Sequence, residues 1–327
     1  MPALVRLGLF GLFAVSCLVV MGRLWVESLR SQPAAVKTLT VPAGSTASDV
    51  LKGLHPSLSA RERALVFSLY PELTHVQQGK YAFAHHATVL SALEKIHRGD
   101  AMIERITIPE GITASTLFAR VSAHDALGGE LTLSDGVWEG LSDSWSSHEG
   151  AFLAETYLWQ QDLSKDALLD KAHQALVETL ELAWIHADPT VKSLLKSPYE
   201  LLILASIVEK ETALAVERPR IAGVFLERLK RKMRLQTDPT VIYGLGERFD
   251  GNLTRQHLRE KTPYNTYRIS GLPPTPIALV GPDAIGAVAH PEITGELYFV
   301  ADGSGGHVFS RTLEAHNANV RKYQLKR

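Results

Sequence analysis

Short stretches of alternating apolar and polar residues are followed by helical patterns, once near the start of the chain and again further on. Leu39 and Val41 alternate with threonines before a Pro-Ala-Gly turn, and a helix that Ser45 or Thr46 can cap comes next. Residues 106–122 repeat this order of strand, turn and helix as a loose internal repeat. The patterning therefore predicts the α+β fold class.

The pattern also predicts where the chain divides. Residues 38–122 are expected to form a small α+β domain, and residues 149–327 a larger α+β catalytic domain. Residues 123–148 are rich in Gly, Ser and Asp without clear periodicity, which is typical of a boundary segment or an active-site rim.

Regular elements are well marked inside the larger domain. Segment 295–310 reads as two strands joined by a glycine-rich turn, and a helix capped by Thr312 follows it. Segment 164–185 has the periodicity of a long amphipathic helix. Its apolar stripe is predicted to lie in the core and consists of Leu168, Leu169, Ala172, Leu176, Leu180 and Ala183.

The N-terminus carries one long apolar run. Residues 7–26 are apolar apart from Ser16 and Arg23, about the length of a transmembrane anchor. A cleaved signal peptide is the alternative, although the apolar run continues where a cleavage site should end it. Residues 1–6 would then be cytoplasmic, and the polar, proline-containing residues 27–37 a linker.

A second apolar run ends in charged residues. Ser197 begins a capping box with proline at the first helical position, so a helix should start there. Residues 201–208 are apolar on every side apart from Ser206, as in a helix buried in a core. Glu209 and Glu211 follow two positions apart, about 200° of rotation, so only one can point into a given cleft.

The bulkier apolar neighbours favour Glu211. It follows Ile207 and Val208 by four and three positions, with Leu204 one turn further back. Desolvation raises the pKa of a carboxyl group, so Glu211 could stay protonated and donate a proton to a leaving oxygen. Alternatively, the Glu-Lys-Glu stretch is the solvated end of a buried helix.

A polar and aromatic stretch supplies candidate binding residues. Residues 236–238 stand at the head of a predicted helix, where Asp238 would cap and Pro239 would occupy the first turn. Prolines stiffen the later part of segment 234–276, and tyrosine faces with amide and carboxyl groups suit the surface and hydroxyls of sugars. The candidate carbohydrate-binding residues here are Gln236, Thr237, Asp238, Tyr264, Asn265 and Tyr267.

Composition narrows the classes of function. The formal charge of −1 gives no global attraction to nucleic acid, and the single cysteine, Cys17, allows no internal disulfide. There are 13 histidines, but no His-Glu-x-x-His motif occurs, so neither a metal nor another cofactor is expected. A P-loop, a dinucleotide fingerprint and a Gly-x-Ser-x-Gly nucleophile motif are also missing from the sequence.

Several long motifs resemble those of the endolytic murein transglycosylases (MltG type, YceG-like). They are LASIVEKETA, RLQTDPTVIYGLGERFDG, YNTYRISGLPPTPIALVGPDAIGAVAHP and LYFVADGSGGHVFSRTLEAHN, which span most of residues 197–323. The N-terminal anchor and a small LysM-like domain fit the same family by layout. The third motif contains His290, a further candidate substrate-binding residue.

The resemblance implies a function. Glu211 would be the catalytic residue of a lytic transglycosylase that cuts peptidoglycan glycan strands between N-acetylmuramic acid and N-acetylglucosamine, leaves 1,6-anhydro ends and limits the length of nascent strands. The protein would be a single-pass inner-membrane protein whose catalytic portion faces the periplasm, next to penicillin-binding synthases as possible partners.

One segment departs from the family pattern. An aromatic-Pro-Asp-Thr segment is usual upstream of the catalytic helix, whereas Ala154, Glu155 and Thr156 stand at that place here. Glu155 could replace the aspartate with a longer reach and contact substrate. The departure also motivates the alternative that the protein is a catalytically lapsed, peptidoglycan-binding scaffold of the synthesis machinery. A glycoside hydrolase that uses water is a third possibility.

Overall fold

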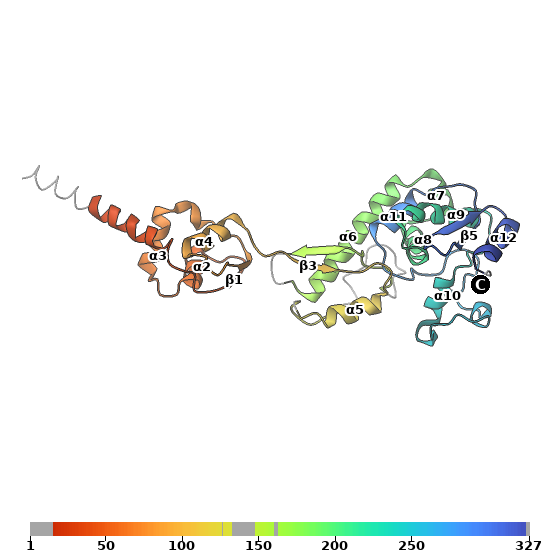
Figure 1. Cartoon of the computed structure of the whole chain (residues 1–327), viewed down its shortest axis with the longest axis horizontal. Coiled ribbons are helices and arrows are strands. Elements are labelled where there is room, and N and C mark those ends of the chain that lie inside the picture. The colour runs from red at the N-terminus through yellow and green to blue at the C-terminus, as the bar shows by residue number, and fades with distance from the viewer. Residues whose placement is uncertain (1–15, 126, 133–147, 160–162, 325–327) are drawn as a thin grey trace, which may run out of the picture. The chain divides into compact units, whose positions relative to one another are not determined.

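The structure is a computed structural model that divides into two compact units, coloured along the chain in Figure 1. The described residues are 16–125, 127–132, 148–159 and 163–324. The smaller unit comprises residues up to 105 with 158–162, and the larger unit comprises 106–157 and 163 onward. Both contain helices and short two-stranded sheets, so the predicted α+β class is confirmed.

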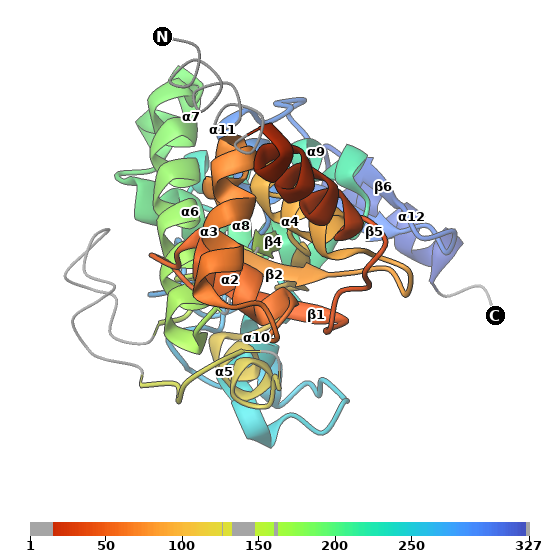
Figure 2. The same ribbon diagram turned by 90° about the vertical axis from the view of Figure 1, so that its left-hand side faces the viewer.

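In the smaller unit, three helices share one core with an antiparallel strand pair (Figures 1 and 2). The pair runs in register from Thr38 opposite Ala82 to Val41 opposite Gly79. Thr46 caps the first of these helices through a capping box, so the cap predicted at Ser45 or Thr46 is Thr46. The elements are β1 (Thr38–Val41), α2 (Ala47–Leu54), α3 (Ala60–Leu69), η1 (Pro71–Thr74), β2 (Gly79–Ala82) and α4 (Val89–Arg98).

A helix over residues 16–28 precedes β1. Val26 and Leu29, at its end, are fully buried in the core of the smaller unit. Residues 7–15 of the anchor predicted over 7–26 lie outside the described residues, and so do residues 1–6. Within residues 16–125, 127–132, 148–159 and 163–324, no helix has the length and apolar character needed to cross a membrane.

The domain boundary differs from the expected one. Residues 106–122, expected in the smaller domain, belong to the larger unit. Their backbone explains this, because Gly111 N–H donates to Leu279 O at 2.9 Å and Leu279 N–H donates to Ile112 O at 2.8 Å. Thr113 caps the helix of this stretch. The predicted boundary segment 123–148 lies in large part outside the described residues.

The larger unit is built around α8 (Pro198–Glu211), which packs against helices on several sides (Figure 1). Ser197 caps it, and residues 201–208 are all buried, so the predicted core helix is confirmed. The hydroxyl of Ser206, the polar exception, donates to Ile203 O at 2.7 Å and accepts Ile277 N–H at 3.0 Å. The helices around α8 are α6 (Lys165–His186), α9 (Arg218–Lys230), α10 (Asp238–Leu245) and α11 (Pro282–Ala289).

The other elements of the larger unit confirm the predicted patterns. The stripe of α6 is buried at Leu168, Leu169, Ala172, Leu176 and Leu180, whereas Ala183 is half-buried. β5 pairs with β6 as an antiparallel hairpin, and Thr312 caps the following helix. The remaining elements of the chain are β3 (Glu104–Thr107), α5 (Ala114–Ser122), β4 (Thr156–Trp159), α7 (Pro189–Leu194), η2 (Ala215–Glu217), η3 (Gly246–Arg248), η4 (His257–Arg259), β5 (Tyr298–Ala301), β6 (His307–Ser310) and α12 (Leu313–Tyr323).

Candidate active site

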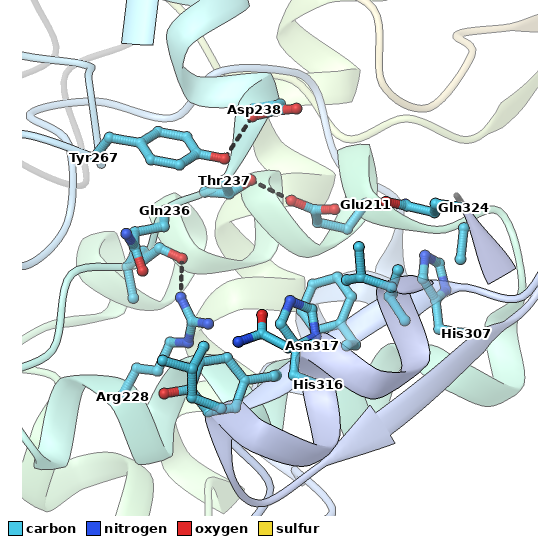
Figure 3. Close-up of a pocket in the computed structure, with 17 residues that line it drawn as sticks. Glu211, Arg228, Gln236, Thr237, Asp238, Tyr267, His307, His316, Asn317 and Gln324 are labelled. Carbon is cyan, nitrogen blue, oxygen red and sulfur yellow. Dashed lines mark hydrogen bonds between the residues drawn. The ribbon is translucent and has the colours of Figure 1, made fainter. Parts of the chain in front are cut away.

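A cavity of about 610 Å³ lies in the larger unit at the carboxyl end of α8 (Figure 3). Its other walls are segment 235–238, strands β5 and β6, and helix α12. Its volume lies within the range of small-ligand sites, and its polar side chains converge on one space. Among the predicted site residues, those that line it are Glu211, Gln236, Thr237, Asp238 and Tyr267.

Glu211 is the last residue of α8 and is half-buried at the cavity wall. The Thr237 hydroxyl donates a hydrogen bond to its Oε1, as Figure 3 shows. Burial raises the pKa of the Glu211 carboxyl, because the charged form loses hydration. The Thr237 hydrogen bond acts in the opposite direction, and the nearby Asp238 carboxylate raises the pKa further. The site therefore makes the Glu211 carboxyl group a weaker acid than a solvated glutamic acid.

Glu209 has a different surrounding, although it lies only two residues away. Its Oε1 accepts a hydrogen bond from the buried Arg218 guanidinium at 2.7 Å, and its Oε2 accepts Gly281 N–H at 3.2 Å. Arg218 also donates to Glu110 at 2.8 Å. Burial raises the pKa of Glu209, while the Gly281 N–H and the Arg218 charge oppose this. Only one of the two glutamates faces the cavity, as the helix rotation predicted.

Segment 236–238 forms the part of the wall next to Glu211. Gln236 has a φ of 51°, the left-handed region that non-glycine residues rarely adopt and that often marks functional sites. Thr237, not Asp238, is the N-cap of α10, and Asp238 is the first helical residue. The predicted cap was therefore one residue late, and the Asp238 carboxylate accepts a hydrogen bond from the Tyr267 hydroxyl at 2.6 Å.

The tyrosine loop, residues 264–267, contains three predicted site residues, and they have different roles. Tyr267 lines the cavity, and burial together with its bond to Asp238 raises its pKa. Asn265 is fully buried, and its amide donates to the backbone oxygens of His257 and Glu260 at 3.1 and 2.6 Å. Tyr264 bonds Thr275 at 2.9 Å. Asn265 and Tyr264 therefore hold the loop in shape, and neither lines the Glu211 cavity.

Two further predicted residues lie elsewhere. Glu155 is exposed, accepts Thr156 N–H at 2.8 Å, and lines a separate hollow together with Glu110 and Asp283. His290 is exposed after α11, where its Nδ1 lies 3.1 Å from Asp188 Oδ1. Neither side chain lines the Glu211 cavity.

The cavity also contains residues that the sequence analysis did not single out as site residues. Arg228 is buried, and its guanidinium donates to Leu297 O at 2.6 Å and Leu235 O at 2.8 Å. It therefore joins α9 to the two segments that form neighbouring walls. His307 and His316 reach the cavity from β6 and α12. Their motif was visible in the sequence, but only the hairpin brings it to Glu211.

The histidines do not form a metal centre with their neighbours. Burial lowers the pKa of His316, and its ring stacks on Tyr298 with centroids 5.2 Å apart. In the part of the chain that the structure describes, no group of three or more His, Cys, Asp or Glu side chains could hold a metal ion.

Thr237→Val tests the hydrogen bond to Glu211. The Thr237 hydroxyl lowers the pKa of Glu211, so its removal should raise that pKa further. If Glu211 acts as an acid, activity is lost as the pH rises through its pKa, and the alkaline limb should therefore move to higher pH. The pH profile of kcat/KM measures this. An unmoved alkaline limb would show that Glu211 is not the group that titrates.

Known proteins are similar to this chain over most of its length. The family model described as the YceG-like family matches residues 39–322. A 127-residue stretch is 46% identical to the endolytic murein transglycosylase of Bacillus subtilis (strain 168), and covers 39% of this chain and 35% of the relative. Over 324 residues the chain is 27% identical to the endolytic murein transglycosylase of Streptococcus pneumoniae (strain R6), across 88% of this chain and 58% of that relative.

A solved structure has a related fold. A crystal structure of a protein described as YceG-like, from Listeria monocytogenes, superposes with a TM-score of 0.55 at 29% identity, and covers 86% of this chain and 98% of that one. The chain spans 58% or less of the length of the Bacillus and Streptococcus relatives. The family model covers most of the chain, and the protein therefore belongs to the YceG-like family.

Proposed function

We propose that the protein is a lytic transglycosylase of peptidoglycan, with Glu211 as its catalytic acid and base. The observation that carries this proposal is a glutamate at the end of a buried helix, with its pKa raised by burial, in the wall of a polar cavity. The names of its Bacillus and Streptococcus relatives support the same class of reaction.

One carboxyl group is sufficient for this chemistry. Protonated Glu211 donates its proton to the glycosidic oxygen, and the bond from that oxygen to C1 of the muramyl residue breaks. The resulting carboxylate then accepts the proton of the muramyl 6-hydroxyl as its oxygen closes on C1, which leaves a 1,6-anhydro end and restores the acid. The Thr237 hydroxyl donates to one oxygen of Glu211 and so orients the group.

Hydrolases differ because they use a pair of carboxyl groups. Asp238 is the other carboxylate among the described residues that line the cavity, and its Oδ1 accepts the Tyr267 hydroxyl. Because this carboxylate already accepts a hydrogen bond, we assign Asp238 a role in binding. The reaction without water is therefore the better fit.

The substrate follows from the walls of the cavity. Gln236, Asp238 and Tyr267 present amide, carboxyl and phenol groups, which suit the hydroxyls and acetamido groups of a glycan strand. We further propose cleavage within strands, which limits nascent strand length, and a location at the inner membrane facing the periplasm with synthases nearby. The apolar stretch 7–26 supports the location.

The end groups of the products test the proposal. Full-length protein is incubated with uncrosslinked glycan strands, and the products are analysed by mass spectrometry. We expect 1,6-anhydromuramyl ends and fragments of intermediate length. Reducing ends that contain an added water would identify a hydrolase, and binding without any cleavage would identify a lapsed scaffold.

A further inference from the structure

Glu217 and His307 form a pair beside the cavity, although they lie far apart in the sequence. Glu217 Oε2 is 2.7 Å from His307 Nδ1, and Glu217 Oε1 accepts the backbone N–H of His307 at 2.8 Å. Both side chains are largely buried, at 15% and 14% exposure. One carboxylate thus holds both the ring and the backbone of the histidine, which fixes the position of the imidazole.

The turn before His307 is shaped for this contact. Asp302 Oδ1 accepts the N–H groups of Ser304 at 2.7 Å and Gly306 at 3.3 Å. A Cβ at Gly306 would lie only 3.1 Å from Glu217 Oε1, so a side chain there would crowd the carboxylate. The ring of Phe299 meets the imidazole edge to face, with centroids 5.4 Å apart. The glycine-rich turn therefore does more than join two strands.

These contacts determine the hydrogen-bonding character of the imidazole. A carboxylate oxygen can only accept a hydrogen bond, so Nδ1 carries a hydrogen and donates it in the bond to Glu217. In the neutral ring Nε2 is then an acceptor. No hydrogen bond from the described residues engages Nε2, and His307 lines the same cavity as Glu211 (Figure 3).

We propose that His307 is a substrate-contact residue, whose Nε2 accepts a hydrogen bond from a sugar hydroxyl of the glycan beside Glu211. Glu217 is a positioning residue, because it sets the tautomer and the orientation of the ring. This inference rests on the proposed function, since it assigns the ligand of the same cavity. If the Glu217–His307 pair served only to stabilise the hairpin, His307 would need no acceptor at Nε2.

Binding to an inactive background tests the inference without turnover. Glycan strands freed of peptides are titrated into full-length Glu211→Gln protein, with and without His307→Asn. The asparagine amide can still donate to Glu217 but has no group at the position of Nε2. One lost hydrogen bond should weaken binding about threefold to tenfold. His186→Asn, at the exposed end of α6, is the matched control and should leave binding unchanged.

Imidazole ¹⁵N spectra of His307 report on its two ring nitrogens separately. If His307 had only a structural role, adding glycan would not change the Nε2 shift. We expect the Nδ1–H tautomer in the free protein and a shift of Nε2 when glycan is added, with the tautomer preference lost in Glu217→Leu, which removes both acceptor oxygens. Unchanged affinity in His307→Asn, or an Nε2 signal that glycan leaves in place, would overturn the inference. If wild type makes no anhydro ends but binding still needs His307, the proposed reaction fails while the contact stands.

Discussion

Glu211→Gln is expected to lower the rate of 1,6-anhydro end formation by about 100- to 10,000-fold, the range typical of removing a general acid or base. The same carboxyl group would give the proton to the glycosidic oxygen and take one from the muramyl hydroxyl, so one substitution removes both transfers. The glutamine amide oxygen can still accept the Thr237 hydrogen bond, so the cavity should keep its shape. The products are counted by mass spectrometry of the strand ends.

Glu181→Gln is the matched control, because Glu181 is exposed on α6. It makes the same change of side chain in the larger unit and should retain wild-type turnover. Wild-type turnover in Glu211→Gln would place the acid elsewhere, with Glu209 as the next carboxyl group to test.

The stability of Glu211→Gln should also differ from wild type with pH. The pKa of Glu211 is raised from 4.5 by burial, so the folded state holds this proton more tightly than the unfolded state does. That stabilisation is fully present below pH 4.5 and is lost as the pH rises through the raised pKa. Glutamine does not titrate, so the variant should gain stability relative to wild type as the pH rises, as measured by urea unfolding.

Arg218→Met is expected to destabilise the larger unit by about 3–5 kcal/mol, the cost of leaving one partner of a buried ion pair alone. Its guanidinium is 2.7 Å from Glu209 and 2.8 Å from Glu110, and the Arg218 side chain is only 6% exposed. Glu209 would keep the Gly281 N–H but lose its counter-charge. Hydrogen exchange of α8 peptides in increasing urea measures the loss.

Arg248→Met is the control, since the Arg248 guanidinium lies 3.1 Å from Glu260 and the two side chains are 59% and 37% exposed. An exposed pair of this kind contributes at most about 1 kcal/mol. If both variants lose the same stability, the buried pair does not hold the end of α8. The double variant Arg218→Met with Glu209→Met should recover part of the loss, because no buried charge is left unpaired.

The position of Glu211 at the cavity was predictable because it depends on local geometry. A capping signal at Ser197 set the start of the helix, and the helical rotation separated Glu209 from Glu211. The sequence did not reveal that Arg218 and Gly281 hold Glu209, since these partners come from other elements. The role of the second glutamate is therefore a result of tertiary packing.

The tyrosine loop shows the limit of residue type as a guide. Tyr264, Asn265 and Tyr267 have equally suitable chemistry for sugars, yet only Tyr267 lines the cavity. Asn265 is fully buried and satisfies backbone carbonyls of its own loop. An amide suits both roles equally, because a buried backbone oxygen and a sugar hydroxyl make the same demand on a donor.

By itself, the sequence determined the α+β class, the buried helix with its cap, the closing hairpin and which of the two glutamates faces the cavity. Each of these follows from spacing along one element or from a turn a few residues long. Only the tertiary structure decided that residues 106–122 belong to the larger unit, and that Arg228, His307 and His316 stand around Glu211. Their positions depend on contacts between segments far apart in the chain, which no local pattern encodes.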